Sequence, residues 1–241
     1  MKVSIARQLI GINRSFYNDF ARSWSTSRVT IHPGIVRVFD LMQPTGHMLD
    51  LGCGDGRVGR WARDRAELLS MESYLGADFS DELLRNAEKD DADISFVCAD
   101  LCAAGWSHKI RDRRARYDSI VCFSALHHIP GHEQRLSVMR EVHELLEPGG
   151  KFAVSVWQLS HVPRLQQKIV PWETVNLSQN ELEANDLLVD WKMGGEGFRY
   201  VHEFSERELL RLFHDAGFHE AEAFRSDGQT GDMGLYVLGR R

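Results

Sequence analysis

The sequence contains no long hydrophobic run, since nowhere do apolar residues approach the roughly 18 in succession that a membrane-spanning helix needs. Its opening segment, Met1 to Gln8, lacks the extended apolar stretch of a secretory signal. We therefore expect a cytoplasmic protein that makes no contact with a membrane. The 241 residues fit one large domain with a two-sided hydrophobic core.

Cysteine is scarce, and none of the four cysteines belongs to a C-x-x-C pair. We interpret them as small hydrophobic residues rather than as redox or zinc ligands. His127, His128 and His132 form an H-H-x-x-x-H pattern, but no acidic residue or cysteine completes a zinc site around them. We therefore expect no bound metal.

Positive charge is also in deficit, because the net charge is −6 with histidine neutral. This argues against a protein that coats nucleic acid through a dominating positive field. A local basic patch is still compatible with the charge, and residues 109–116 (KIRDRRAR) are one candidate. We favour the interpretation of this run as a solvated connection over that of a binding patch.

The sequence does contain a regular alternation of strand and helix patterns over residues 46–157. Apolar runs predict strands, and helical spacing predicts helices between them: strands at 47–51, 73–77, 94–98, 117–123 and 152–157, helices at 58–69, from 80 onward and at 132–146. Such alternation produces parallel sheets with right-handed crossovers. We expect an α/β fold whose sheet is covered on both faces.

Three further segments flank this core and complete a single domain of residues 1–241. Residues 1–45 are expected to form an N-terminal helical cap. Residues 158–204 break the alternation, and we interpret them as an insertion that serves as a substrate lid over the carboxyl edge of the sheet. In residues 205–241, Ser205 and Glu208 have the spacing of a capping box at a helix start. Gly217 ends that helix, and strands at 218–224 and 235–238 close the chain.

A glycine-rich loop at residues 50–56 (DLGCGDG) follows the first predicted strand. Glycine permits positive φ and close approach of the backbone to a ligand, and the next helix begins with unpaired N–H groups. Residues 54–59 also match G-x-G-x-x-G, a dinucleotide pattern that is weak on its own. Asp50 and Asp55 would repel a pyrophosphate but not a cationic sulfonium, so the loop favours an adenosylmethionine-type ligand over NAD.

Two more acidic residues stand at the ends of the next two strands. Asp78 is placed to accept the ribose hydroxyls of a nucleoside, and Phe79 to pack on its adenine. Asp100 is placed to accept the adenine amino group. Acidic residues at three consecutive strand ends indicate one shared site, because parallel strands end at the same edge of a sheet.

These motifs, taken in order, resemble those of class I methyltransferases: residues 49–56 (LDLGCGDG), 76–80 (GADFS), 98–101 (CADL) and 145–150 (LLEPGG). The resemblance implies a Rossmann-like, three-layer α/β/α fold with a seven-stranded, mostly parallel sheet and an antiparallel last strand. It implies S-adenosyl-L-methionine as cofactor, with S-adenosyl-L-homocysteine as product. The cofactor-binding residues that it implies are Asp50, Gly52, Cys53, Gly54, Asp55, Gly56, Asp78, Phe79, Ser80, Asp100, Leu101, Phe123 and Ser124.

Other segments resemble the tRNA methyltransferases that esterify carboxymethyluridine at the wobble position. They are residues 16–28, 124–129 (SALHHI), 170–172 (VPW) and 198–204 (FRYVHEF). This narrower resemblance implies tRNA as methyl acceptor. It also implies a small activating partner subunit, which eukaryotic members of the subgroup use.

A carboxylate acceptor is already ionised at neutral pH, so the enzyme mainly has to position it. Arginine suits this task because its guanidinium binds a carboxylate in bidentate fashion. We predict that Arg28 and Arg199 hold the acceptor and that Tyr200 and His202 shape its pocket. His127 is predicted to orient the acceptor or to act as a base, while at least one of His127 and its neighbour packs structurally.

Two alternatives remain open at this point. A methyltransferase acting on a small metabolite would be favoured by a closed apolar pocket walled by Trp172, Trp191 and Phe198. A tRNA enzyme would be favoured by a continuous basic face joining residues 109–116 to the N-terminal arginines (Arg7, Arg14, Arg22 and Arg28). A methyltransferase-like protein that only binds a partner is the other alternative, and the three strand-end acids count against it.

Overall fold

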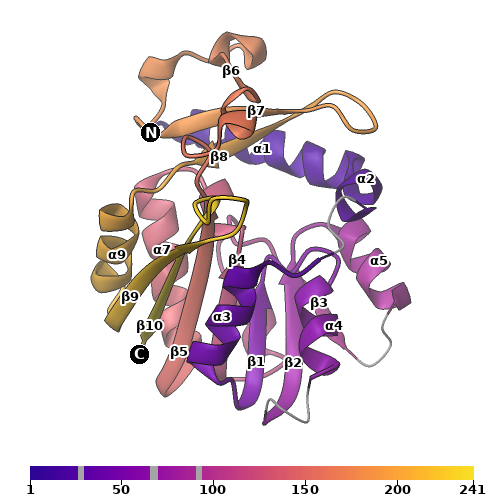
Figure 1. Ribbon diagram of the computed structural model, residues 1–241, viewed down its shortest axis with the longest axis vertical. Coiled ribbons are helices and arrows are strands. Elements are labelled where there is room, and N and C mark those ends of the chain that lie inside the picture. Colours follow the sequence, from indigo (N-terminus) through magenta and orange to yellow (C-terminus); the bar gives the residue numbers. More distant parts are fainter. Residues whose placement is uncertain (27–29, 66–69, 91–93) are drawn as a thin grey trace.

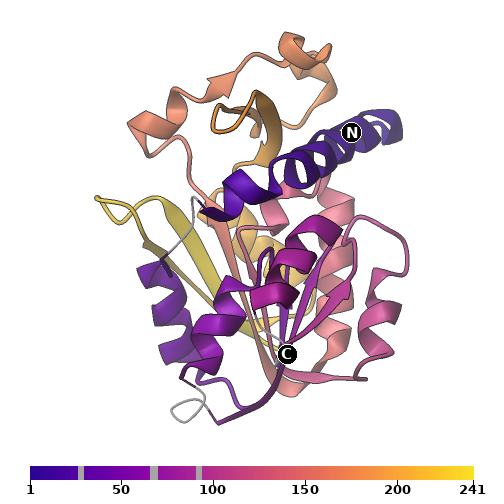
Figure 2. The same cartoon turned by 90° about the vertical axis from the view of Figure 1, so that its right-hand side faces the viewer.

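Seven strands form a central sheet, and helices cover both of its faces (Figures 1 and 2). The computed structural model describes residues 1–26, 30–65, 70–90 and 94–241. The strand order is β3–β2–β1–β4–β5–β10–β9. The strands are β1 (Gly46–Leu51), β2 (Met71–Asp78), β3 (Ser95–Cys98), β4 (Tyr117–Phe123), β5 (Leu146–Trp157), β9 (His219–Ser226) and β10 (Gly234–Arg240).

Only β10 runs against its neighbours, pairing antiparallel with both β5 and β9. The five strands from β1 to β5 pair in parallel. The fold predicted from the sequence is therefore confirmed, including its antiparallel last strand. β5 is longer than predicted and starts at residue 146, directly after the helix that precedes it.

Alternate residues of each strand point to opposite faces, as the pleat of a strand requires. Leu49 and Ile120 pack with the helices α6 (Trp106–Arg111), α7 (His132–Leu145) and α9 (Glu206–Asp215). Met48 and Val121 pack on the other face with α3 (Pro33–Met42), α4 (Arg57–Arg63) and α5 (Asp81–Asp90). The near-continuous apolar character of the strands follows from burial on both sides. The last residues of the helix predicted at 58–69 lie outside the described residues.

Residues 158–204 contain a second, three-stranded antiparallel sheet that the sequence patterns did not predict. It consists of β6 (Ile169–Val170), β7 (Asp186–Trp191) and β8 (Gly197–His202). Three short helices accompany it: α8 (Pro163–Gln166), η2 (Trp172–Val175) and η3 (Gln179–Glu181). The small sheet stands beyond the carboxyl edge of the large one (Figure 1).

The N-terminal helices α1 (Val3–Asp19) and α2 (Ala21–Thr26) lie between the two sheets (Figure 1). Asn13 of α1 binds the edge of β8 as another strand would. Its Oδ1 accepts the Tyr200 N–H at 2.8 Å, and its Nδ2 donates to the Tyr200 carbonyl at 3.1 Å. The buried side chain amide therefore satisfies a strand edge that would otherwise be open. No helix in the described ranges is long and apolar enough to cross a membrane.

The capping box predicted at the start of α9 is only half formed. The Ser205 hydroxyl accepts the Glu208 N–H at 3.2 Å, as an N-cap does. The Glu208 carboxylate does not return to Ser205 but binds Nε2 of His202 at 2.8 Å. A buried histidine therefore competes successfully for the carboxylate. Gly217 follows the helix with φ of +96°, as its predicted role requires.

Candidate active site

A cavity opens where the carboxyl ends of β1, β2, β3 and β4 meet, and α1 and α2 cover it. It contains about 1050 Å³ of empty space, open solvent at its mouth included, which is ample for a nucleoside-sized ligand. Eleven of the thirteen residues predicted to bind the cofactor line it: Asp50, Gly52, Cys53, Gly54, Asp55, Asp78, Phe79, Asp100, Leu101, Phe123 and Ser124.

The glycine loop has a backbone that other residues would strain. Gly52 and Gly54 have φ of +72° and +58°. A Cβ on Gly52 would lie 2.3 Å from the Ala125 side chain, and one on Gly54 would lie 2.9 Å from the Trp24 ring. The loop is therefore glycine-rich both for its conformation and because neighbouring side chains pack directly against it.

Asp78 holds this loop in place. One carboxylate oxygen accepts the Gly54 N–H and the other accepts the Ser80 N–H, both at 2.9 Å. Burial raises the pKa of Asp78 to about 6, against the lowering effect of these hydrogen bonds. A carboxylate has about four acceptor positions, so Asp78 can still accept a hydroxyl from a ligand in the cavity.

Asp50 lies below the loop and accepts a hydrogen bond from the Tyr74 hydroxyl at 2.5 Å. Burial raises its pKa to about 7, and the charge of Asp78 adds to the rise. In all, four aspartates and two arginines, Arg14 and Arg57, line the cavity. A cationic ligand would relieve this excess of acidic groups, which fits a sulfonium cofactor and does not fit a pyrophosphate.

Asp100 has partners that the sequence did not indicate. It accepts the Cys102 N–H at 2.9 Å and a short hydrogen bond from Arg14 of α1. Ile10, Asn13, Arg14 and Tyr17 all line the cavity. Their spacing along α1 places them on one helix face, which is the signal that could have identified them.

Two predicted cofactor residues do not line the cavity. Ser80 is fully buried, and its hydroxyl donates to Asn18 at 2.9 Å and accepts the Leu83 N–H. Gly56 precedes α4 with φ of +76°, and a Cβ there would lie 2.7 Å from the Phe96 ring. Both residues shape the loop from behind instead of facing a ligand.

The two histidines after β4 differ in position, and the one that lines the cavity is not His127, for which a role toward the acceptor was predicted. His127 is fully buried, packs against both His128 and Trp157 at centroid distances of 4.3 and 4.7 Å, and does not line the cavity. His128 does line it. Its Nε2 lies 2.8 Å from the Tyr17 hydroxyl and its Nδ1 2.8 Å from the Tyr200 carbonyl. His128 therefore faces the cavity, whereas His127 packs in the interior, and a role of either toward a substrate stays a prediction.

Arg199 is 4% exposed and projects from β8 among aromatic rings. Its guanidinium lies 4.8, 5.0 and 5.1 Å from the ring centroids of Phe16, Trp157 and Trp191. Burial lowers its pKa, while the adjacent Tyr17 hydroxyl opposes that effect. Tyr17 thus connects Arg199 to the cavity. Arg28, predicted as the second arginine of this site, lies outside the described residues.

Tyr200 and His202 do not join Arg199, and the pleat of β8 explains why. Residues 200 and 202 point to the opposite face from residue 199. The Tyr200 hydroxyl donates to Asp186 at 2.8 Å, and the His202 ring bridges Asp186 and Glu208 at 2.8 Å each. Neither side chain lines the cavity, so their role in shaping an acceptor pocket stays a prediction.

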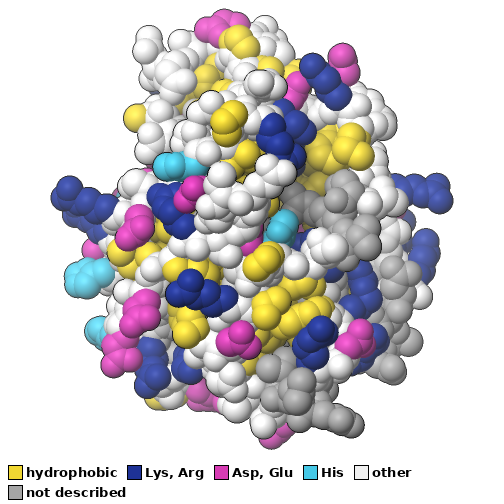
Figure 3. Space-filling view, viewed as in Figure 1, with side chains coloured by type: hydrophobic (Ala, Val, Ile, Leu, Met, Phe, Trp, Pro, Cys, Tyr) yellow, Lys and Arg dark blue, Asp and Glu magenta, His cyan; other side chains and the backbone are white. Residues whose placement is uncertain are grey.

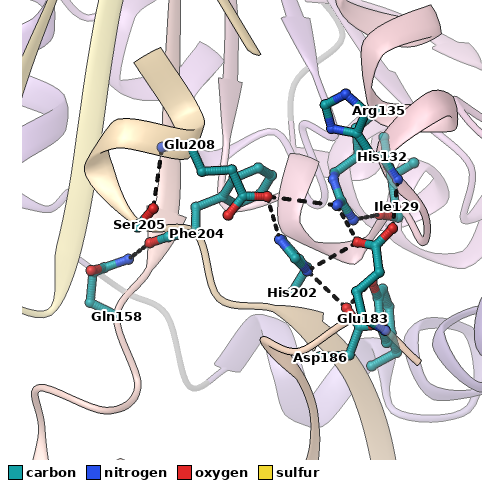
Figure 4. Close-up of polar contacts among 11 residues, drawn as sticks. Ile129, His132, Arg135, Gln158, Glu183, Asp186, His202, Phe204, Ser205 and Glu208 are labelled. Atoms are coloured by element: carbon teal, nitrogen blue, oxygen red, sulfur yellow. Dashed lines mark hydrogen bonds and ion pairs between the residues drawn. The ribbon is translucent and has the colours of Figure 1, made fainter. Parts of the chain in front are cut away.

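His202 belongs instead to a buried ionic cluster that ties the small sheet to α7 and α9 (Figure 4). Arg135 of α7, 1% exposed, donates to Glu183 at 2.5 Å and to the Ile129 carbonyl at 3.1 Å. Ligand atoms of Glu183, Asp186 and His202 lie within 4.8 Å of one another. The spacing would suit a metal, but the Arg135 guanidinium already supplies the cation there.

The hydrogen bonds of His202 require a charged ring. Ionised carboxylates only accept, so both ring nitrogens must donate to Asp186 and Glu208. Burial by itself would lower the pKa of His202, but these two hydrogen bonds outweigh it and the pKa is raised. Burial would raise the pKa values of Glu183 and Glu208, but Arg135 and His202 outweigh it and lower both.

We expect the free energy of unfolding to fall at both ends of the pH range because of this cluster. Its raised pKa makes the His202 contribution complete below the ordinary histidine pKa, and the contribution is lost as pH rises through the raised value. The Glu183 and Glu208 contributions are lost as pH falls through their lowered values. In His202→Gln the contribution of the charged ring to the free energy of unfolding, roughly 1–3 kcal/mol, should already be missing at neutral pH. Urea unfolding measured across pH tests this.

The matched control is His214→Gln, which changes a histidine of α9 whose side chain is 85% exposed. It should reproduce the wild-type pH curve. A His202→Gln curve that runs parallel to the wild type above neutral pH would contradict a charged His202.

Solved structures similar to this chain include methyltransferases. An S-adenosylmethionine-dependent methyltransferase of Methanosarcina mazei aligns with a TM-score of 0.64 at 19% identity, covering 88% of this chain and 99% of that one. The 1,6-didemethyltoxoflavin-N1-methyltransferase of Burkholderia thailandensis, solved with S-adenosylhomocysteine, aligns with a TM-score of 0.62 at 19% identity, covering 99% of this chain and 89% of that one. The fold of the chain is thus the class I methyltransferase fold.

Residues 24–222 match the sequence pattern of a family described as a methyltransferase domain, and the chain belongs to that family. Its domain thus has the fold found in S-adenosylmethionine-dependent methyltransferases. Among curated proteins, the yeast tRNA (carboxymethyluridine(34)-5-O)-methyltransferase is 28% identical over 65% of this chain and 54% of its own length. The mouse protein named probable tRNA methyltransferase 9B is 24% identical over 66% of this chain. The chain spans about a third of that relative's length.

Proposed function

We propose that this methyltransferase transfers a methyl group to a carboxylate, and that a carboxymethylated wobble uridine of tRNA carries it. The observation behind the proposal is Arg199, a buried cation placed among aromatic rings next to the cavity. A guanidinium is well suited to bind a carboxylate there. The names of the distant relatives agree with this acceptor.

In this proposal S-adenosylmethionine is the cofactor and lies in the cavity between the glycine loop and α1. Asp78 accepts its ribose hydroxyls, Asp100 faces its adenine, and the acidic residues of the loop attract its positive end. Its sulfonium supplies an electrophilic methyl group. The protein then has to hold the acceptor oxygen in line with that methyl group. No proton has to be removed, because the carboxylate is already ionised.

The described residues form neither the continuous basic face that would favour a tRNA enzyme nor the closed apolar pocket that would favour a small-metabolite enzyme. Residues 109–116 lead to the start of β4, at the opposite edge of the sheet from the cavity, and Arg111 and Arg116 bind Glu144 and the Leu146 carbonyl. Acidic and basic side chains are interspersed on the face seen in Figure 3. Trp172 packs in a different cluster from Trp191, so no shared apolar pocket forms. Both the tRNA and the small-metabolite proposals therefore depend on the cavity itself.

The test is transfer of a labelled methyl group from S-adenosylmethionine into bulk tRNA or into a small-metabolite extract, followed by mild alkali. Methyl esters release their label as methanol under alkali, whereas methyl ethers and methylamines do not. We expect alkali-labile label in tRNA, reduced about 100-fold in Arg199→Met, because hydrogen bonds to charged groups contribute roughly 1.5–3 kcal/mol each. Arg225→Met is the control.

Alkali-labile label in the extract alone would replace tRNA with a small carboxylate as the acceptor. Unchanged transfer by Arg199→Met would overturn the carboxylate role of that residue. The activating partner subunit remains a prediction, and adding cell extract to the tRNA reaction tests it.

A further inference from the structure

A chain of polar groups runs along the cavity wall beside Arg199. The Tyr17 hydroxyl lies 2.8 Å from Nε2 of His128, and both residues line the cavity. Nδ1 of His128 lies 2.8 Å from the Tyr200 carbonyl. Asn13 also donates to the His128 carbonyl at 3.2 Å, so the histidine is held through both its ring and its backbone.

The direction of the protons in this chain follows from the chemistry of its end. A carbonyl oxygen only accepts, so Nδ1 of His128 carries hydrogen. In the neutral ring, Nε2 is then an acceptor, and the Tyr17 hydroxyl donates to it. This is the arrangement of a hydroxyl activated by a base, with the base oriented by a third group.

Arg199 lies next to the Tyr17 hydroxyl. It is buried among Phe16, Trp157 and Trp191, where little water can screen its charge. A negative charge on the phenol oxygen is stabilised by that cation. Among the described residues, further charged or titratable groups lie near these hydrogen-bonded side chains: His127 beside His128, Asp190 near Arg199, and Arg14 with Asp100 in the same cavity.

We propose that Tyr17 and His128 form a general-base pair, which equips this enzyme to methylate nucleophiles that carry a proton, such as hydroxyl or ring N–H groups. A carboxylate does not need such a pair, so this activity goes beyond the function proposed above. It depends on the methyltransferase family and the cavity, and not on the acceptor being tRNA.

The step balances within the groups present. A lone pair of the acceptor atom forms the bond to the methyl carbon, and the electron pair of the breaking bond returns to sulfur. The acceptor's proton passes to the Tyr17 oxygen as the Tyr17 proton passes to Nε2 of His128. The resulting imidazolium keeps its Nδ1–H bond to the Tyr200 carbonyl and later releases one proton to water.

The labelled-methyl assay tests this proposal through the alkali-stable products, measured in both RNA and small-molecule extracts. Wild type should give alkali-stable label whose rate of formation rises with pH. Tyr17→Phe should reduce that label roughly 100-fold, the usual contribution of a general base. Tyr117→Phe is the control, because Tyr117 is a buried tyrosine at the far edge of the sheet.

Nitrogen-15 NMR of the His128 ring gives a second measurement that needs no acceptor. The resonances are assigned by their loss in His128→Gln. We expect the Nδ1–H tautomer, with an Nε2 signal that shifts in Tyr17→Phe and an Nδ1 signal that does not. An Nε2–H tautomer would overturn the proposal. So would a wild-type enzyme that forms no alkali-stable label, or a Tyr17→Phe variant that forms it at the wild-type rate. Loss of the alkali-labile label alone would instead overturn the carboxylate function.

Discussion

Asp78→Asn is expected to weaken S-adenosylmethionine binding about 100-fold or more. The carboxylate of Asp78 accepts N–H groups from Gly54 and Ser80 on separate oxygens. An asparagine amide presents a donor to one of these N–H groups, so one side of the loop loses its support. The ribose loses a charged acceptor at the same time. Two charge-assisted hydrogen bonds at roughly 1.5–3 kcal/mol each account for the expected change.

Calorimetric titration with S-adenosylmethionine measures this effect, with Asp40→Asn as the control. Asp40 is an exposed aspartate of α3, and its replacement should leave the affinity unchanged. Thermal unfolding of both variants without ligand separates loss of binding from loss of fold. Affinity of Asp78→Asn within about threefold of wild type would show that Asp78 does not bind the cofactor.

Arg135→Met is expected to lower the free energy of unfolding by about 3–5 kcal/mol, the usual cost of leaving buried charges without their partner. Arg135 neutralises Glu183 at 2.5 Å, lies 3.9 Å from Glu208 and satisfies the Ile129 carbonyl. Methionine fills a similar volume but leaves three acceptors without their donor. The loss is large because the guanidinium lies in the interior and water cannot replace it.

Urea unfolding at neutral pH measures this loss, and Arg140→Met on the same helix is the control because Arg140 is exposed. Adding Glu183→Gln to Arg135→Met should recover part of the stability, since it removes one of the uncompensated charges. Equal stability of Arg135→Met and Arg140→Met would mean that the cluster contributes nothing to the fold.

The sheet and the cofactor cavity could be predicted because their signals are local in the sequence. Each acidic residue lies at or next to the end of its own strand, and the parallel order of the strands brings these ends together. Asp50, Asp78 and Asp100 therefore meet at one cavity, as expected. The part of the cavity wall contributed by α1 was missed, because helical spacing shows which residues share a face but not what that face covers.

The acceptor side was predicted less well because it depends on pairings between distant segments. Arg199, Tyr200 and His202 were assigned together as neighbours in sequence, yet the pleat of β8 sends residue 199 to one face and residues 200 and 202 to the other. Which of His127 and His128 lines the cavity is likewise decided by contacts with distant segments. Their positions in a short turn are settled by Trp157, Tyr17 and the Tyr200 carbonyl, none of which is adjacent in sequence.

The amide of Asn13 that completes the edge of β8 joins residues 187 positions apart. During synthesis α1 is made before the sheet, and β8 follows only after the strands β1 to β5 have been made. Contacts of such wide sequence separation form late in folding. The glycine loop and its aspartates can therefore assemble as a shallow, open depression early in synthesis. That depression is covered only when β8 has been made and holds α1 in place.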